Sequence, residues 1–590
     1  MNLHLTKGSR ERSLAILTLV IMAIFIVRLF YLQVIRHNYY MAQANAEQVK
    51  QLTIPATRGL IYGMDGSSLA PLVLNQAVYT VYADPSEVTN SQKVIDMVTK
   101  VAGGNAVSNM SALLANKQSR YAVLAYNVSR TQAADMKNEN LAGVGFTEGT
   151  ERVYPEGDLA GQVLGFVNAA GQGQYGVEGY FNKQLSGTNG MLKTVTDVRD
   201  VPLDIGSNNV DKPAVNGQNI ALTVDRNIQA EAQKVLADNA KKLKIKNESV
   251  IVMDPNNGHV LAMANYPSYN PGDYNTVTDP SVFQNAVISS PYEPGSDTKT
   301  LTSAAAINEG VMKPSDTYTN TGQIDVDGSI INNATKTANI TGNITIQTAM
   351  DYSLNTGFVT VEQWLGGQNA PPGTATINTK ARDELYKYFH DRFRLGEMTG
   401  IQLQGEDPGT IYSPNDAEGG AVRYSNMAFG QGFDATMLQM ATAFSSVVNG
   451  GTYYYPTIYA GTVSSDGTTL TPAKDRAPVK DVVSSGTSQT VRAMVHDARD
   501  RFYAKDDTPG YYVGGKTGTS QVIVNGTYSL TKTIGTYLGF GGAVGQLPSY
   551  VIMVRVSNAD YTLEGNFDAM PVFNQLSNWM LRYLKLQPKG

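Results

Sequence analysis

A single apolar run near the N-terminus constrains the fold of this 590-residue chain more than any other feature. The run extends from Leu14 to Ile35 and carries one charged residue, Arg28, near its C-terminal end. About 20 consecutive apolar residues are enough for a helix to cross a bilayer, and a long cationic side chain near the end can reach the lipid headgroups. The sequence therefore predicts a transmembrane helix over residues 14–35.

Basic residues on one side of this run predict its orientation. Lys7, Arg10 and Arg12 precede it, and positively charged flanks stay in the cytoplasm. We expect a cytoplasmic tail over residues 1–13, with the rest of the chain on the extracytoplasmic side of the cell membrane. A removable signal peptide is the rival interpretation. The bulky stretch Phe30-Tyr-Leu offers no small-residue cleavage site, so an uncleaved anchor is favoured.

The length and composition of the chain restrict its class. A chain of 590 residues exceeds the size of one hydrophobic core, so at least two domains are expected after the anchor. The net charge of -5 argues against nucleic acid as a partner. Cysteine is absent and the five histidines are scattered. Thiol chemistry is therefore excluded, and neither a metal site nor a cofactor is expected.

Residues 36–215 predict an elongated pedestal module of mixed α/β structure with a structural or docking role. A polar helix is expected to continue out of the membrane from Asn38 to Gln51. Asp65-Gly66 is a hairpin-turn signal between two apolar runs. Ser91 to Val101 has the pattern of an amphipathic helix. No cluster of chemically reactive side chains stands out in this part of the sequence.

A second domain is expected over residues 216–590. A strand ending at Asp225 precedes a helix that starts near Ile228, and the apolar runs 250–253 and 259–264 flank a turn and predict a β-hairpin. Together with the helix described next, this order predicts an antiparallel sheet packed between helices. The chain as a whole is then of the mixed α/β (α+β) class.

The most informative stretch is Pro294-Gly-Ser-Asp-Thr-Lys299, which precedes an apolar helical run. We expect Ser296 to open a helix that stops at Gly310 and to share one helix face with Lys299. A desolvated lysine can take the proton of a serine hydroxyl, and N–H groups at a helix start can stabilise an oxyanion. Alone this pattern is weak, because a serine at a helix start is usually a cap.

Two further clusters can complete such a site. Ser353-Leu-Asn355 follows a helical stretch over 346–350, and its side chains could relay a proton and hold a substrate amide, although Ser-x-Asn is also a frequent turn sequence. Lys516-Thr-Gly518 lies among strand-forming residues. There the lysine and Thr517 offer a cation and a hydroxyl to a carboxylate, and Gly518 lets a substrate backbone lie close to the strand.

The third cluster also matches a nucleotide-binding pattern. Gly510 to Thr517 reads G-x-x-x-x-G-K-T, the sequence of phosphate-binding loops. Such a loop requires a helix directly after the lysine, whereas the residues that follow here alternate like a strand. We therefore expect no nucleotide site.

The order Ser296-x-x-Lys299, Ser353-x-Asn355, Lys516-Thr-Gly518 is similar to the triple signature of penicillin-recognising serine enzymes. Nearly the whole chain resembles a class B penicillin-binding protein, a monofunctional cell-wall transpeptidase. The division type is somewhat closer than the elongation type. Flanking segments strengthen the match: Arg58-Gly, Arg152-x-Tyr-Pro155, Glu293-Pro-Gly-Ser, Gly396-x-x-Thr-Gly400 and Phe429-Gly-Gln-Gly432.

The resemblance implies D,D-transpeptidation of peptidoglycan stem peptides with release of D-Ala. Ser296 would be the nucleophile and Lys299 its base. Ser353 and Lys516 would pass the proton to the leaving amine. Asp297 is expected to add negative charge near Lys299 and so to limit the fall of the lysine pKa.

The resemblance also implies how the substrate is held. Asn355 would orient the donor peptide amide, and Thr517 and Thr519 would bind the terminal carboxylate beside Gly518. The backbone N–H groups of Ser296 and Thr519 would form the oxyanion hole. Implied partners are the stem peptides, β-lactam antibiotics that acylate the serine, the membrane through one helix, and a polytopic glycan polymerase with division or elongation proteins.

The sequence also bears on four other functions. A β-lactamase would need a group that activates deacylating water, and no Glu-x-x-Leu-Asn-like segment lies between the second and third motifs. A bifunctional class A enzyme would need a glycosyltransferase motif with a histidine, and no histidine lies between His37 and His259. A D,D-carboxypeptidase differs only in its acceptor, and a scaffold or β-lactam sensor needs no turnover, so both alternatives stay open.

Overall fold

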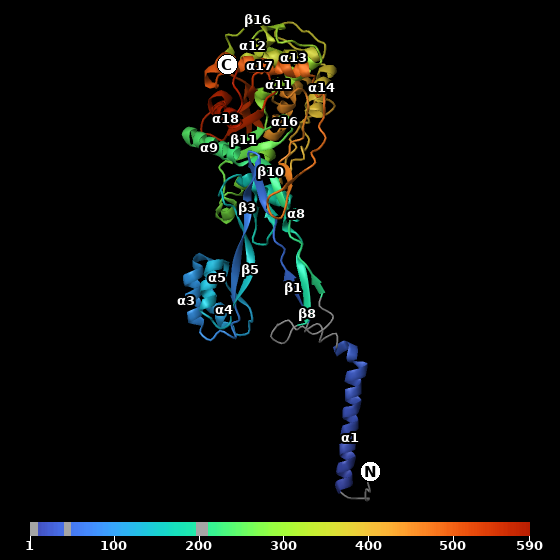
Figure 1. The fold of residues 1–590 in the computed structure, drawn as a ribbon. Coiled ribbons are helices and arrows are strands. Elements are labelled where there is room, and N and C mark those ends of the chain that lie inside the picture. The colour runs from blue at the N-terminus through green and yellow to red at the C-terminus, as the bar shows by residue number, and fades with distance from the viewer. Residues whose placement is uncertain (1–9, 41–48, 196–209, 525, 590) are drawn as a thin grey trace. The chain divides into compact units, whose positions relative to one another are not determined.

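The computed structural model describes residues 10–40, 49–195, 210–524 and 526–589 (Figure 1). The chain forms two compact units. The anchor unit consists of Met1–Arg58 with Ser186–Gly217, and the main unit consists of Gly59–Leu185 with Gln218–Gly590.

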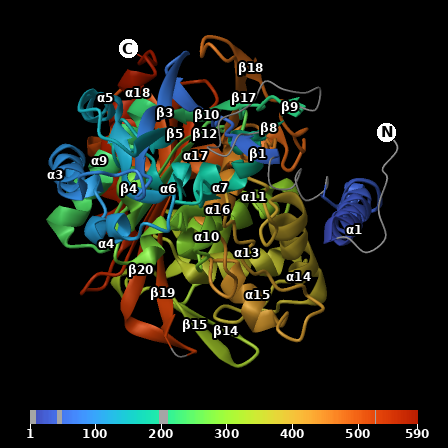
Figure 2. The ribbon, with the colours of Figure 1, turned by 90° about the horizontal axis from the view of Figure 1, so that it is seen from below.

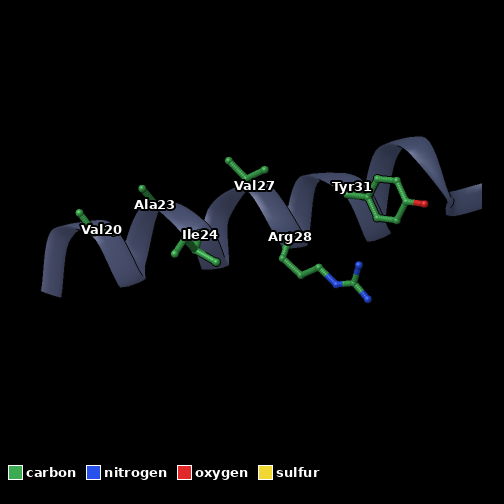
Figure 3. A pocket seen from close by; sticks show the side chains of 6 residues that line it. All are labelled: Val20, Ala23, Ile24, Val27, Arg28 and Tyr31. Atoms are coloured by element: carbon green, nitrogen blue, oxygen red, sulfur yellow. The ribbon is translucent and has the colours of Figure 1, made fainter. Parts of the chain in front are cut away.

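The anchor unit contains the predicted membrane helix. Helix α1 (Arg10–Phe30) continues into a π-helical turn, Tyr31–Ile35, and together they are long and apolar enough to cross a membrane. Figure 3 shows six side chains at helical spacing along this segment, from Val20 to Tyr31. The hollow that they line is formed by this one helix and encloses nothing, so we interpret it as surface that lipid would cover.

The predicted helix from Asn38 to Gln51 is wrong at its C-terminal end. Residues 37–40 are helical, but Val49–Ile54 forms strand β1, which pairs antiparallel with β8 (Gly190–Val195). Strand β9 (Val210–Lys212) pairs with the other edge of β8. The hydrogen bonds of β1 to β8, which is distant in sequence, outweigh the local polar pattern that predicts a helix. Such dependence on tertiary context is common for strands. Residues 41–48 of the predicted helix lie outside the described residues.

In the main unit, a seven-stranded sheet joins early and late parts of the chain. Strand β10 pairs parallel with β2 and antiparallel with β17, and the predicted turn at Asp65-Gly66 joins β2 to β3. The strands are β2 (Ile61–Asp65), β3 (Ser68–Ala83), β4 (Ala122–Ser129), β5 (Val144–Val153), β10 (Asn219–Asp225), β17 (Tyr459–Val463) and β18 (Leu470–Pro472).

Short helices cover the end of this sheet that holds β4 and β5. They share one apolar cluster with these strands (Figure 1). They are α3 (Ser91–Ala102), which confirms the amphipathic helix, α4 (Met110–Ala115) and α5 (Arg130–Asn138). Small elements follow in the chain: α6 (Gly161–Leu164), β6 (Phe166–Val167), β7 (Gly173–Gln174), α7 (Gly176–Tyr180) and α8 (Asn182–Ser186).

A second, five-stranded sheet of the main unit is fully antiparallel. Its spatial order is β12 (Val260–Tyr266), β11 (Asn247–Met253), β21 (Tyr550–Ser557), β20 (Thr527–Ala543) and β19 (Tyr511–Val524). Strands β11 and β12 are the predicted hairpin. Figure 2 shows β19 and β20 running side by side, and β19 is the edge strand.

Helices cover both faces of this sheet, which confirms the predicted antiparallel sheet between helices. One face packs against α9 (Arg226–Leu243), whose N-terminus is capped by the Asp225 carboxylate, and α18 (Met570–Tyr583). The other face belongs to the main apolar core. The helices on that side are α10 (Ala286–Ser289), α11 (Lys299–Asn308), α16 (Met437–Val448) and α17 (Ser485–Tyr503).

A smaller helical lobe completes the main unit beyond α11. Its helices are α12 (Ile346–Asp351), α13 (Asn355–Leu365), α14 (Thr379–Tyr386) and α15 (Ala421–Met427). Two hairpin-like pairs accompany them: β13 (Thr317–Asn320) with β16 (Gly342–Thr345), and β14 (Gln323–Val326) with β15 (Ser329–Asn332). The three sequence motifs lie at three places in the main unit: at the start of α11, at the junction of α12 and α13, and on β19.

Candidate active site

The segment with Ser296 enters its helix through a tight turn. Gly295 has a φ of +63° and its N–H donates to the carbonyl of Gly430 at 2.8 Å. Gly295–Thr298 forms a 3-10 turn, and the α-helix begins only at Lys299. The prediction that Ser296 opens the α-helix is therefore wrong: Ser296 lies in the 3-10 turn that precedes the helix. The serine is partly exposed, whereas Lys299 is completely buried.

The helix ends where the sequence predicts. Helix α11 stops at Asn308, and Gly310 follows in the left-handed conformation with a φ of +71°. The N–H of Gly310 donates to the carbonyl of Ile307, and that of Val311 donates to the carbonyl of Ala306. This pair of bonds is the Schellman termination that favours glycine.

The Lys299 amine meets oxygen atoms from two motifs. Its Nζ lies 2.9 Å from Ser296 Oγ, 2.8 Å from Asn355 Oδ1, 2.7 Å from the carbonyl oxygen of Ser353 and 3.2 Å from Ser353 Oγ. A neutral amine has two N–H donors and one lone pair. The two carbonyl-type oxygens can accept both donors, which leaves the lone pair free to accept the proton of Ser296.

The surroundings of Lys299 favour its neutral form. Burial lowers its pKa well below the ordinary lysine value, and the nearby positive charge of Lys516 lowers it further. The expectation that Asp297 would hold this pKa up is not met. The carboxylate of Asp297 accepts a hydrogen bond from Thr536 Oγ1 at 2.7 Å, and its charge acts on Lys516 instead.

The second motif lies at the junction of α12 and α13. Ser353 has a φ of +57°, a left-handed conformation that is unfavourable for a residue other than glycine. Its hydroxyl lies between two lysines, 3.2 Å from Lys299 Nζ and 2.9 Å from Lys516 Nζ. Asn355 begins α13, and its Nδ2 donates to the carbonyl of Asn332 at 2.9 Å, which turns its Oδ1 toward Lys299.

The third motif lies on the edge strand β19. Lys516 is buried, and its Nζ also donates to the carbonyl oxygen and to the Oγ1 of Thr517, at 3.0 and 3.3 Å. Burial lowers the pKa of Lys516, while the negative charge of Asp297 raises it. Thr517 is partly buried and Thr519 is exposed on the same strand.

Close backbone contacts hold this strand against the Ser296 segment. A Cβ added at Gly518 would lie 2.8 Å from the carbonyl oxygen of Pro294, and one added at Gly295 would lie 2.7 Å from the carbonyl oxygen of Thr519. Because β19 remains a strand through Val524, no helix follows Lys516 and the phosphate-loop pattern has no matching structure, as expected.

The three motifs thus converge in one hydrogen-bonded chain from Ser296 through Lys299 and Ser353 to Lys516, with Asn355 at its side. Thr517, Gly518 and Thr519 continue along β19 next to it. Such an arrangement can remove the proton of a serine hydroxyl, carry it past a second hydroxyl and present a cation near the strand edge.

Sequence reasoning missed three supporting residues. Asn332 contributes only its backbone carbonyl, so its side chain gives no signal. Thr536 binds Asp297 across the sheet, and an isolated threonine in a strand is unremarkable in sequence. Gly430 belongs to one of the flanking segments, but the sequence does not indicate its role: a Cβ there would overlap the carbonyl of Gly295. Paired glycines at a close approach are recognisable only in the fold.

Comparison with known families gives two matches. A model of the penicillin binding protein transpeptidase domain matches residues 248–578. A model of the penicillin-binding protein dimerisation domain matches residues 53–222.

Curated relatives match over nearly their full length. Stage V sporulation protein D of Bacillus subtilis is 30% identical over 98% of this chain and 87% of its own length. Peptidoglycan D,D-transpeptidase FtsI of Escherichia coli is 26% identical over 97% of this chain and 91% of its own length. The crystal structure of penicillin binding protein 2X from Streptococcus thermophilus covers 91% of this chain and 80% of that chain, with a TM-score of 0.72 at 23% identity, and shows likeness of fold.

The contact at Gly295 leads to a prediction about reactivity. We expect Gly295→Ala to slow acylation of Ser296 by a fluorescent β-lactam at least about tenfold, because the new Cβ would push β19 away from the serine. Gly310→Ala is the matched control. It has a similar positive φ at the other end of the same helix, but its Cβ would meet no atom within 4 Å.

Both variants should lose about 1–2 kcal/mol of stability from the left-handed alanine. Labelling kinetics and thermal unfolding measure the two effects separately. Equal labelling rates in the two variants would contradict the role given to the Gly295 contact.

Proposed function

The chain belongs to the class B penicillin-binding proteins, and we propose that Ser296 is the nucleophile with which it cross-links peptidoglycan. It is a serine-type peptidoglycan D,D-transpeptidase, a function carried by the transpeptidase-domain match over more than half of the chain and by relatives of that name. The contact that supports the role of Ser296 is the 2.9 Å distance from its Oγ to the buried Nζ of Lys299.

Acylation begins when neutral Lys299 accepts the proton of Ser296. The serine Oγ then attacks the carbonyl carbon of the penultimate D-Ala of a donor stem peptide. The negative charge that develops on the carbonyl oxygen is stabilised by the backbone N–H groups of Ser296 and Thr519. Because Lys299 is desolvated, it can act as a base at a pH far below the ordinary lysine pKa.

The tetrahedral intermediate collapses when the leaving amine receives a proton. Ser353 donates its hydroxyl proton to that nitrogen and is reprotonated from Lys299 or Lys516, both within 3.2 Å of its Oγ. The C–N bond breaks, D-Ala leaves, and an ester remains on Ser296. An amine of a neighbouring stem peptide then attacks the ester carbonyl and loses a proton to the same relay. The bond between the carbonyl carbon and Ser296 Oγ breaks, and the relay returns a proton to Oγ.

The substrate lies along the edge of β19. The terminal carboxylate binds the hydroxyls of Thr517 and Thr519 near the Lys516 cation. The missing side chain of Gly518 leaves room for Pro294 and Thr536, which keeps this strand close to Ser296. Asn355 keeps Lys299 in place through Oδ1 and can orient the donor amide with the same group. A β-lactam presents a carbonyl and a carboxylate at similar positions and acylates Ser296 by the same path.

We also propose the arrangement of the whole chain. Residues 1–13 form a cytoplasmic tail, 14–35 the membrane helix, 36–215 a pedestal of the dimerisation type and 216–590 the transpeptidase domain. Among the described residues, one helix is long and apolar enough to span a membrane, and it fits an anchor with the catalytic domain outside the cytoplasm. The pedestal and the anchor would contact a polytopic glycan polymerase and division proteins, consistent with relatives named for division-type enzymes.

The nucleophile is tested with a serine variant. Ser296→Ala should abolish labelling by fluorescent penicillin and abolish cross-linking of donor and acceptor stem peptides, as measured by mass spectrometry of the products. Ser303→Ala is the control, because Ser303 lies on the helix that follows Ser296, is fully buried and has a hydroxyl that bonds to none of the described residues. Its activity should stay near the wild-type level.

The products decide between related functions. Cross-linked dimers support the transpeptidase, and hydrolysed stems alone would indicate a D,D-carboxypeptidase. Labelling without any turnover would indicate a β-lactam sensor, and no labelling of the wild type would indicate a scaffold.

The two buried lysines predict a bell-shaped pH dependence of acylation. At low pH the rate should fall as Lys299 becomes protonated, and its lowered pKa places this loss well below the ordinary lysine range. At high pH the rate should fall as Lys516 loses its proton, again below the ordinary range because burial lowers its pKa. Stopped-flow acylation from about pH 5 to about pH 11 measures both limbs.

Lys516→Arg separates the two limbs, because a guanidinium stays charged throughout this range. The variant should keep the acidic limb and lose the alkaline one. If the acidic limb moved and the alkaline limb stayed, the roles of the two lysines would be reversed.

The orientation of the anchor is tested in intact cells. With the outer face exposed, added protease should digest the chain beyond residue 36 and spare a tag fused before residue 10. A protected catalytic domain would contradict the proposed topology.

A further inference from the structure

A row of polar residues crosses the five-stranded sheet behind the nucleophile. Thr536 on β20, Arg555 on β21, Ser249 on β11 and Asn265 on β12 are successive cross-strand partners. Residues in register on neighbouring strands lie on the same face of a sheet. This row is therefore a polar line within the face that otherwise packs the main apolar core.

Arg555 is the one formal charge of this row. Its side chain is only 7% exposed, and NH1 donates to the carbonyl of Ser290 at 2.7 Å. The guanidinium lies 5.1 Å from the ring centre of Tyr292. Among the described residues, no carboxylate forms an ion pair with Arg555. A buried guanidinium without an anionic partner is unfavourable, because an ion taken out of water loses its hydration.

The guanidinium lines a cavity of about 540 Å³. The walls of the cavity include Ser249, Asn265, Gln284, Ser290 and Ser557. Within the described part of the chain, the side chains of Gln284, Ser290 and Ser557 have no hydrogen-bond partner, so their amide and hydroxyl groups are free to bind a ligand. The volume is many times that of a water molecule in liquid, which is about 30 Å³.

The other charged residues of the cavity do not neutralise Arg555. Glu248 precedes Ser249 on β11 and therefore points to the opposite face, where its Oε1 accepts from Asn239 of α9 at 2.9 Å. Burial raises the pKa of Glu248 to about 8, so it is largely uncharged at neutral pH. Asp279 accepts from the N–H of Ser281 at 2.9 Å as the cap of its own turn.

Lys246 adds a second cation at this cavity. Its Nζ pairs with Asp560 at 2.8 Å, and both of these side chains are well exposed. The buried part of the cavity thus has a positive charge, several unpaired hydroxyl and amide groups, and no anion of its own.

We propose that this cavity binds an oxyanion, a carboxylate or phosphate group, whose oxygen atoms pair with the Arg555 guanidinium. The planar fork of N–H donors in arginine matches two oxygens of such a group. The hydroxyls of Ser290 and Ser557 complete the hydrogen bonds of the anion. This inference is independent of the transpeptidase chemistry, since none of these residues belongs to the three motifs.

The site lies behind the catalytic segment. Arg555 contacts Ser290 and Tyr292, which precede Ser296 in the same segment, and its cross-strand partner Thr536 binds Asp297. A ligand in the cavity would therefore bind Arg555, the residue that contacts the segment before Ser296.

Calorimetric titration of the full-length protein in detergent tests the proposal. Sodium phosphate and, separately, sodium acetate are added at pH 7 and constant ionic strength maintained with sodium chloride. We expect saturable binding of one anion per chain for at least one of the two, and the one that binds identifies the oxyanion group. Arg555→Gln should weaken this binding about tenfold or more, the usual effect of losing a charged hydrogen-bond donor.

Arg492→Gln is the matched control. The Arg492 guanidinium also donates to a single backbone carbonyl, that of Val448 at 3.1 Å, but it does not line this cavity. The anion affinity of Arg492→Gln should equal that of the wild type.

Arg555→Lys keeps the positive charge but lacks the planar guanidinium, so it should bind the anion with reduced affinity. This variant tests the proposal if Arg555→Gln does not fold. Labelling of Ser296 by fluorescent penicillin reports folding in every variant.

The proposal is overturned if neither anion binds more tightly than chloride, or if Arg555→Gln binds as the wild type does. Thermal unfolding gives a second readout. Phosphate or acetate should raise the Tm of the wild type and of Arg492→Gln, but not that of Arg555→Gln, because a ligand that binds only the folded state stabilises it.

Discussion

The burial of Lys299 beside Ser296 is the interaction on which the rest of the site depends. In water a lysine amine is protonated at neutral pH and cannot accept a proton from serine. Here the amine is fully buried, and a second cation, Lys516, lies on the far side of Ser353. Both effects favour the neutral amine. The surrounding oxygen atoms accept its hydrogens without supplying a negative charge that would return the proton.

The fold achieves this burial by bringing three structural boundaries together. Helix α11 carries the lysine into the core, the α12–α13 junction places Ser353 against it, and the edge strand β19 closes the site with Lys516. The strand can come this close because each side of the contact has a glycine. Gly295 meets the backbone of Thr519, and Gly518 packs against Thr536 and Pro294. Gly430 meets Gly295 from another segment. Asp297 is buried next to Ser296 in sequence, and its carboxyl group raises the pKa of Lys516 and does not act on that of Lys299.

Much of this arrangement could be predicted from sequence, because it depends on side-chain types and on local periodicity. The roles proposed for Ser296, Lys299 and Lys516 depend on the chemistry of their side chains. The helix and the strand that hold them have clear periodicity in the sequence, so the motifs and the predicted elements agree. The antiparallel sheet and the stop at Gly310 follow for the same reason. The carbonyl of Asn332, the left-handed Ser353 and the partner of Asp297 depend on backbone positions set by distant segments. The strand β1 was missed because its pairing with β8 is equally non-local.

The proposed mechanism requires Lys299 to be a neutral amine in the resting protein at neutral pH. Nuclear magnetic resonance of the full-length chain with lysine labelled at Cε measures this directly, since the Cε shift follows protonation of Nζ. The Lys299 signal, assigned by its loss in Lys299→Arg, should have the shift of an uncharged amine at pH 7 and titrate only at lower pH. A signal that stays protonated at pH 7 and titrates near the ordinary value of about 10.4 would contradict the account.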